Sequence, residues 1–392
     1  MAIFSGPEIP NNGLVFHYDM SNTVKSWRGA PVVNLAPYTD YSNRNYNTAY
    51  DIGGWGGDDA DVFYYNSGGY NNLPYKKMVK HTGGTGGSYI NEHGYFTLTE
   101  GVTYNISCYM RANVATTVSG HTLALNRDSD NSYRVPADIA LTTDWVKQTW
   151  IYTCAVGEGG ATYHFRQIVY NDTQLPLEVY WCGLQISEGT ISYPYVNGTR
   201  SNTQAILDLT GNNIITASGL AYSSNNTFSF PGNNSLSIPA IDFSQAQTVE
   251  IWLQPLENDA TRRNPYNQAY GGYGSWTHEP SGNINYYYGD AGSNNTPYVG
   301  HTSGFTVVQN EIAHVVSTRN TTASYWYKNG VLDSTFSHGY GTLTTDTNPI
   351  LIGTGYSASY IGNIFSVKLY NRALSAAEVQ QNFEATRGRY GI

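Results

Sequence analysis

The feature that most limits the fold is a set of short segments in which apolar and polar residues alternate. In residues 102–112, VTYNISCYMRA, the side chains of Tyr104, Ile106, Cys108 and Met110 share one face, because strand side chains repeat every two residues. Similar segments recur roughly every 10–20 residues between glycine- and asparagine-rich turns. The 41 glycines and the charged fraction of 12% favour short strands over long helices. The pattern predicts an all-β protein.

One helix is predicted, close to the C-terminal end of the chain. Ser375 can act as an N-cap, and Glu378 follows three residues later, which is the spacing of a capping box. Val379 and Phe383 are four residues apart and form an apolar stripe. Gly388 is the expected end of this helix.

The order of the strands indicates that one domain is inserted into another. Residues 13–22, GLVFHYDMSN, read as a strand and a turn, but the segment resembling their continuation, AILDLTGNNIITASG, begins only at Ala205. Residues 31–200 between them form a self-contained series of strands without a helical period, which favours a jelly roll or similar sandwich. We expect residues 1–30 to supply the first strand of a sandwich completed by residues 201–392. A tandem arrangement, with residues 1–30 as an arm, is the alternative.

Three local features give sharper expectations. In residues 177–187, LEVYWCGLQIS, the apolar positions predict a buried strand with an irregularity at Gly183, such as a bulge. Asn329-Gly330 suits a type I′ hairpin turn, since both residues tolerate positive φ. In the last strand, Ile364 is expected to face away from Phe365, Val367 and Leu369.

Charge and composition exclude several classes of protein. The net charge is −9 and no basic cluster occurs, so nucleic acid is not an expected partner. No apolar run approaches the roughly 20 residues that cross a bilayer, and the first residues lack the pattern of a secretory signal. Cys108, Cys154 and Cys182 are odd in number and lie in strand-like sequence, so buried thiols are expected rather than disulfides or a metal site.

The carboxylates do not form the set that a glycan hydrolase needs. Retaining hydrolysis uses two carboxylates about 5 Å apart. Glu250 stands alone in its strand, TVEIWLQP, and Glu257 and Asp259 follow Pro255 in a segment that reads as a loop. The histidines show no spacing typical of zinc ligands. The sequence therefore does not predict an enzyme.

Binding through aromatic side chains is the better expectation, because sugar C–H faces stack on rings while amides and carboxylates contact the hydroxyls. Two segments combine rings with polar residues. Three consecutive tyrosines in a strand must place a ring on each face. The candidate glycan-binding residues are Trp55, Tyr64, Tyr65 and Tyr70 in the first segment, and Tyr270, Tyr273, Trp276, Tyr286, Tyr287 and Tyr288 in the second.

Longer stretches carry a family resemblance that covers nearly the whole chain. NLAPYTDYSN, YFTLTEGVTYNISCYMRA and VYWCGLQISEGTISYPYVNGTRS resemble, in this order, a jelly-roll module of phage and prophage virion proteins that is similar to carbohydrate-binding modules. GLVFHYDMSN, QTVEIWLQP and YIGNIFSVKLYNRALSAAEVQQNFEATRGRYGI resemble the laminin-G-like, concanavalin-A-like lectin sandwich. The resemblance implies a bacteriophage virion structural protein, located in a tail fibre, a tail tip or a head-surface fibre.

The implied function is adsorption to host-surface glycan without turnover. The implied partners are other virion proteins and a host cell-surface polysaccharide, with neither nucleic acid nor membrane insertion, and a homotrimer is one expected assembly. The protein would be made in the host cytoplasm. A structural capsid or tail decoration protein that binds no sugar is the alternative, and a glycan hydrolase ranks third.

Both families often hold calcium, which directs attention to one acidic loop. Asp58, Asp59 and Asp61 group in GGDDADV, and a hard cation needs several such oxygens converging. The alternative interpretation is that these aspartates are ordinary turn residues. No other cofactor is expected.

Overall fold

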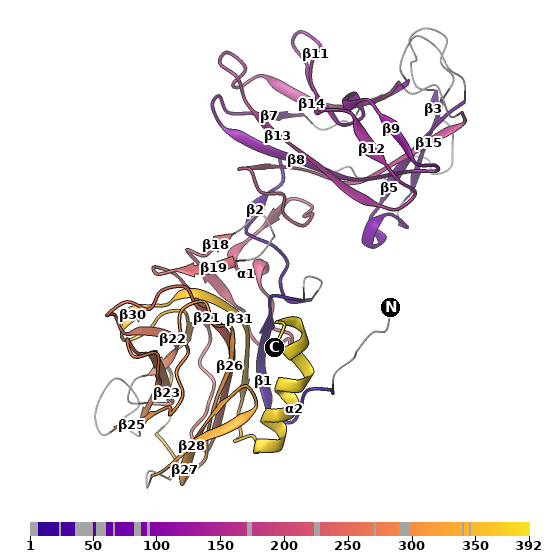
Figure 1. The fold of residues 1–392 in the computed structure, drawn as a ribbon. Coiled ribbons are helices and arrows are strands. Elements are labelled where there is room, and N and C mark those ends of the chain that lie inside the picture. Colours follow the sequence, from indigo (N-terminus) through magenta and orange to yellow (C-terminus); the bar gives the residue numbers. More distant parts are fainter. Residues whose placement is uncertain are drawn as a thin grey trace. The chain divides into compact units, whose positions relative to one another are not determined.

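The protein folds into two compact units rich in β-strands (Figure 1). Residues 1–30 and 201–392 belong to unit 1, and residues 31–200 form unit 2. The prediction of an all-β protein with a C-terminal helix is confirmed. No helix of the described residues is both long and apolar enough to cross a membrane. The computed structural model describes residues 7–22, 25–35, 50–51, 60–65, 67–81, 88–91, 95–170, 175–222, 228–269, 272–289, 298–338, 341–344 and 346–392.

Two eight-stranded sheets enclose the main core of unit 1. One sheet has the order β18 (Ala221–Tyr222), β19 (Phe228–Pro231), β31 (Ile361–Tyr370), β21 (Gln247–Pro255), β26 (Ala313–Arg319), β27 (Ala323–Lys328) and β28 (Val331–Ser337), with β1 (Leu14–Asp19) also paired to β31. The other has the order β17 (Thr216–Ser218), β20 (Ser235–Ile238), β29 (Ile350–Ile352), β22 (Arg263–Ala269), β23 (Gly274–His278), β24 (Ile284–Gly289) and β25 (Tyr298–Thr302), with β30 (Ala358–Ser359) on β22.

The first and last strands of the chain pair with each other. β1 runs antiparallel to β31, with His17 opposite Lys368 and Tyr18 opposite Val367. Figure 1 shows the indigo β1 beside the yellow C-terminal helix. The strand at residue 14 therefore completes the sheet that residues 201–392 build.

Helix α2 (Ala376–Thr386) begins as the sequence predicts. The Ser375 backbone N–H donates to Glu378 Oε2 at 2.9 Å, and Ser375 Oγ accepts from the Glu378 backbone N–H, so the capping box is confirmed. The apolar stripe of Val379 and Phe383 is buried. The helix ends at Thr386, two residues before the predicted Gly388, where the Thr386 hydroxyl accepts from Trp252 Nε1 at 3.0 Å. Gly388 lies in the following 3₁₀ turn, Arg387–Arg389.

A buried charge cluster lies where α2 meets the sheet. Lys368 Nζ is 2.5 Å from Glu250 Oε1, and both side chains are 1% exposed. His314 Nε2 is 3.1 Å from the same oxygen, while Asn382 of α2 donates to Glu250 Oε2 at 2.5 Å. Burial raises the pKa of Glu250, but the nearby Lys368 and His314 outweigh it and lower this pKa to about 2. Glu250, singled out in the sequence, is therefore engaged in a structural ion pair.

Unit 2 also encloses its core between sheets. The six-stranded sheet has the order β13 (Val146–Thr153), β8 (Thr103–Ala112), β15 (Leu177–Glu188), β5 (Tyr75–Lys80), β4 (Ala60–Tyr65) and β3 (Tyr50–Asp51). The five-stranded sheet has the order β11 (Ser132–Arg134), β10 (Ala124–Arg127), β14 (Thr162–Val169) and β6 (Ser88–Asn91), with β7 (Phe96–Thr97) on β14. Two short pairs join β12 (Ile139–Leu141) to β9 (Thr116–Val118) and β16 (Thr199–Arg200) to β2 (Val32–Val33). A four-residue helix, α1 (Asn202–Ala205), follows in unit 1.

The local expectations agree with the structure with one exception. Gly183 has φ +63 and lies at a register shift between β15 and β8, so the irregularity is confirmed. Asn329 and Gly330 have φ of +50 and +79 between β27 and β28, as a type I′ turn requires. The prediction for Ile364 is wrong, because a register shift opposite Trp252 and Leu253 puts Ile364 and Val367 in the same core. The cysteines are confirmed as free buried thiols.

Candidate functional site

The best candidate site is a group of aromatic side chains on the outer surface of the six-stranded sheet of unit 2. In β15, Val179 and Trp181 point into the core, so the intervening Tyr180 points outward. This outer surface continues onto the two neighbouring strands, because Tyr180 lies opposite Lys77 of β5 on one side and Arg111 of β8 on the other. We call this surface the aromatic face; it consists of Phe63, Tyr65, Tyr75, Lys77, Arg111, Trp145, Glu178 and Tyr180.

The rings of the aromatic face contact one another. Tyr65 stacks on Tyr75 with centroids 4.4 Å apart and an interplanar angle of 9°. Tyr75 also meets Trp145 edge-on at 6.0 Å and Tyr180 at 6.1 Å. Phe63, Tyr65, Tyr75 and Trp145 remain partly exposed. Their mutual packing fixes ring orientations that a ligand would otherwise have to order.

Charged groups accompany these rings. Lys77 Nζ is 3.3 Å from Glu178 Oε1 and 5.0 Å from the Phe63 ring centroid. The Tyr180 hydroxyl donates to the other carboxylate oxygen of Glu178. Burial raises the pKa of Tyr180, and the hydrogen bond to Glu178 adds to this effect, so the phenol stays protonated at neutral pH. The arrangement offers ring faces, donors and acceptors on one surface, as sugar binding requires.

The structure places the first predicted ring cluster in three different environments. Tyr65 lies on the aromatic face, whereas Tyr64 is 4% exposed and points into the core, so the prediction for Tyr64 is wrong. Tyr70 lies in the 3₁₀ turn Tyr70–Asn72, where its half-buried ring stacks on Tyr109 at 3.9 Å. Trp55 lies outside the described residues.

The second predicted ring cluster is mostly core. Tyr273, Trp276, Tyr286 and Tyr288 are at most 1% exposed, so they cannot stack on a sugar, and their prediction as ligand-binding residues is corrected. The cause is that Trp276 of β23, Tyr286 and Tyr288 of β24, and Tyr273 just before β23 all belong to the main core of unit 1. Tyr287 alternates to the other face and stays partly exposed, with Arg262 5.7 Å from its ring centroid. Tyr270 is not among the described residues.

Of the three aspartates predicted as possible calcium ligands, the structure describes only Asp61. Asp58 and Asp59 lie outside the described residues, and Asp61 Oδ2 is 2.9 Å from His81 Nε2. Within the described part of the chain, no group of three or more His, Cys, Asp or Glu side chains could hold a metal ion. Glu257 and Asp259 both contact Arg263 Nη2, at 3.1 and 2.9 Å, and so form surface ion pairs.

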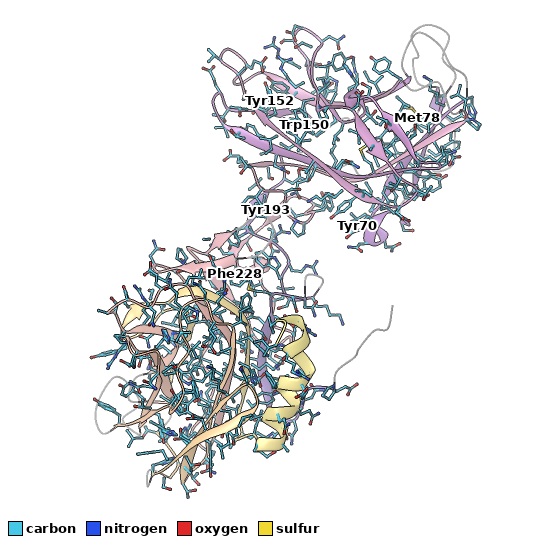
Figure 2. The ribbon with its side chains drawn as sticks, in the orientation of Figure 1. Tyr70, Met78, Trp150, Tyr152, Tyr193 and Phe228 are labelled. Atoms are coloured by element: carbon cyan, nitrogen blue, oxygen red, sulfur yellow. The ribbon has the colours of Figure 1, made fainter. Side chains whose placement is uncertain are left out.

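Unit 2 also has a groove of about 740 Å³, away from the rings of the aromatic face. Its walls include Trp150 and Tyr152, whose ring centroids are 6.1 Å apart on β13. Figure 2 shows these two side chains close together, apart from Tyr70. Arg134 and the Tyr152 hydroxyl both contact Glu158, and the hydrogen bond from Arg134 lowers the pKa of Glu158 to about 2 against the opposing effect of burial. Arg134 and Tyr152 are therefore engaged within the protein itself.

Tyr75, Trp145, Tyr180 and Arg111 were not predicted as site residues. The signal was present in the strand pattern. If Val179 and Trp181 face inward, Tyr180 must face outward, and the inward set of β8 likewise leaves Arg111 outside. What the alternation does not give is which strands are neighbours, and that pairing brings Tyr180, Arg111 and Lys77 together.

Comparison with known proteins gives one sequence match. Residues 230–380, which lie in unit 1, match the laminin-G-like group described as the concanavalin A-like lectin/glucanases superfamily. Unit 1 has the concanavalin A-like lectin/glucanase fold. No curated protein matches this chain in sequence at a significant level.

Several solved structures resemble part of the chain. Domain 4 of AbnA, a GH43 extracellular arabinanase from Geobacillus stearothermophilus in complex with arabinotriose, is 16% identical, with a TM-score of 0.38 over 47% of this chain and 93% of that one. The receptor binding domain of a botulinum neurotoxin C/D mosaic serotype is 17% identical, with a TM-score of 0.39 over 47% and 49%. The binding domain of botulinum neurotoxin DC in complex with SialylT is 12% identical, with a TM-score of 0.39 over 47% and 50%. The match therefore spans about half the length of these two toxin domains.

Proposed function

We propose that this protein is a bacteriophage virion protein that adsorbs to a host-surface glycan through the aromatic face of unit 2. The observation that carries the glycan part is the set of partly exposed rings beside Lys77, Arg111 and Glu178 on one sheet surface. The concanavalin A-like fold of unit 1 is compatible with a lectin-like role. The virion part is supported by the sequence resemblance of unit 2 to a module of phage and prophage virion proteins. The proposed location is a tail fibre, a tail tip or a head-surface fibre, after synthesis in the host cytoplasm.

Adsorption would involve binding without bond cleavage. Sugar rings would stack on Trp145 and on the Tyr65–Tyr75 pair, while Lys77 and Glu178 would contact hydroxyl groups. Each ring contributes modestly, so several must act together for useful affinity. Assembly as a trimer, with other virion proteins holding the chain, would multiply these weak contacts by avidity.

The test is binding of the full chain to host cell-surface polysaccharide and to a glycan array. We expect Trp145→Ala and Tyr75→Ala each to weaken binding by roughly tenfold or more, because a stacking ring is lost. Tyr95→Ala is the matched control, since Tyr95 is a 59% exposed tyrosine of the same unit that lies off the aromatic face. A blank array together with unchanged adsorption of the Trp145 and Tyr75 variants would refute glycan binding through this face.

A second candidate function is structural decoration of a capsid or tail without sugar binding. β13 favours it, because this strand ends the six-stranded sheet and exposes Val146 and Ile151 at 41% and 52%. Exposed edge strands of high β-propensity are typical sites of protein contact. Cofractionation with virions, lost on Ile151→Lys but unaffected by Trp145→Ala, would support this function. Release of reducing ends from the polysaccharide would instead indicate a hydrolase.

A further inference from the structure

Arg111 is held in a fixed position by aromatic rings on the aromatic face. Its guanidinium carbon lies 3.9 Å from the ring centroid of Tyr180, its cross-strand neighbour, and 5.4 Å from that of Trp145. Stacking of this kind orders the side chain and leaves the edge of the planar guanidinium free to donate. The group is therefore already arranged for a ligand above Trp145.

Arg111 differs from Arg127 and Arg134 of the same unit, which both have an acidic partner. Arg127 contacts Asp130, and Arg134 contacts Glu158. Among the described residues, no carboxylate lies within 4.0 Å of the Arg111 guanidinium, and the Glu178 carboxylate is engaged by Lys77 and Tyr180. The hydrogen bond that Arg111 donates is a long one, from Nη1 to the Thr143 carbonyl at 3.5 Å.

The hydrogen-bonding capacity of Arg111 is therefore mostly unused. Its Nε–H is buried and has no acceptor in the described part of the chain, although a buried donor without a partner is destabilising. Among the eight residues of the aromatic face, Lys77 and Arg111 carry two positive charges against the single negative charge of Glu178. Both features favour a negatively charged ligand.

We propose that Arg111 binds the carboxylate of an acidic sugar, so that the glycan recognised by the aromatic face is a polyuronate or another carboxylated polysaccharide. This inference rests on the proposed adsorption function and specifies its ligand. The sugar ring stacks on Trp145 while its carboxylate accepts hydrogen bonds from the guanidinium. A carboxylate is planar and can accept two parallel hydrogen bonds from the guanidinium fork.

The test compares carboxylated glycans with neutralised forms of the same polymer. The full chain is titrated with polygalacturonate, alginate, hyaluronate and polysialic acid, and with the methyl ester of each. We expect at least one acidic polymer to bind roughly tenfold more tightly than its ester, and we expect this preference to shrink as salt rises from about 50 to 500 mM. Arg111→Gln should abolish the preference, so that the acid and ester forms of each polymer bind this variant equally within about twofold.

Two further variants test whether the positive charge or the guanidinium shape of residue 111 matters, and whether loss of any arginine in unit 2 has the same effect. Arg111→Lys keeps the charge but loses the fork, so it should retain only part of the preference. Arg127→Gln removes an arginine of the same unit that already has an acidic partner, and it should behave like the wild type. Near-ultraviolet circular dichroism of each variant confirms that unit 2 is folded.

The outcomes distinguish this inference from the proposed function. Equal binding of acid and ester forms, both lost in Trp145→Ala, would overturn the role of Arg111 while glycan adsorption stands. An acid preference that survives Arg111→Gln would also overturn it. Dextran sulfate binding as tightly as the carboxylated polymers, again through Arg111, would overturn the assignment to a carboxylate. Absence of binding to every polymer, acidic or neutral, would overturn the adsorption function as well.

Discussion

Replacing Lys368 by methionine should destabilise unit 1 strongly, because it leaves the carboxylate of Glu250 buried without its cation. The ordinary pKa of this glutamate is 4.5 and its folded value is about 2. That difference corresponds to about 3 kcal/mol of stability at neutral pH. Breaking a buried pair by removing one partner usually costs about 3–5 kcal/mol, which agrees with this figure. For a unit of this size we expect the melting temperature to fall by roughly 6–12 °C.

The pH dependence of the stability follows from the direction in which the pKa of Glu250 is shifted. Since the folded pKa of Glu250 is lowered, its stabilisation is complete above pH 4.5 and disappears as the pH falls toward 2. The difference between the wild type and Lys368→Met should therefore be largest near pH 7 and should shrink in acid. Differential scanning calorimetry between pH 7 and pH 3 measures this difference directly.

Two variants serve as controls for this prediction. Lys328→Met removes the partner of Glu311 at the surface, where both side chains are about a quarter exposed, and should cost less than about 1 kcal/mol. The double variant Lys368→Met with Glu250→Met buries no charge and should recover most of the lost stability. If Lys368→Met costs no more than Lys328→Met, or if its effect is independent of pH, the buried pair does not hold α2 and the sheet as argued.

Three further predictions concern stability. Burial lowers the pKa of His17 and His301 from 6.5 to about 4, and Lys368 adds to the effect at His17, so both lose stabilisation as the pH falls from 6.5 to 4. The double variant His17→Gln with His301→Gln should therefore show a smaller fall in melting temperature between pH 6.5 and 4 than the wild type. Gly330→Ala should lower the free energy of unfolding, measured in urea, by about 1 kcal/mol or more. The φ of Gly330 is +79, and an added Cβ would lie 3.1 Å from Phe383. Gly341→Ala is the control and should cost less, because Gly341 has φ +64 but an added Cβ there would meet open space. Residues 31–200 expressed alone should unfold cooperatively, since their core is built within that range; gradual, non-cooperative melting would contradict this.

The sequence predicts strands better than it predicts their neighbours. The alternation of apolar and polar residues correctly placed Ile106 and Met110 in the core. A glycine inside a predicted strand correctly marked the irregularity at Gly183. It failed at Ile364, because a bulge adds one residue to β31 and reverses the facing of everything before it. A bulge of this kind leaves no local signal when the residue concerned is not glycine.

The candidate site was only partly predictable for a related reason. Aromatic content marks both core and surface, so Tyr286 and Trp276 looked the same in sequence as Tyr65, although burial separates them completely. The aromatic face depends on residues far apart in the chain, such as Tyr75 and Trp145, that meet only after the strands pair. Their convergence is a property of sheet order rather than of any motif.

Because β1 pairs with β31, this sheet cannot be completed until nearly the whole chain has been synthesised. β1 is synthesised first, but its partner emerges about 340 residues later, on the order of tens of seconds at roughly 5–20 residues per second. All of residues 31–200 are available in the meantime, so the inserted body can finish folding while its host sandwich is still incomplete. During that interval the apolar side of β1 has no partner strand, which makes the nascent N-terminal segment a natural client for chaperones.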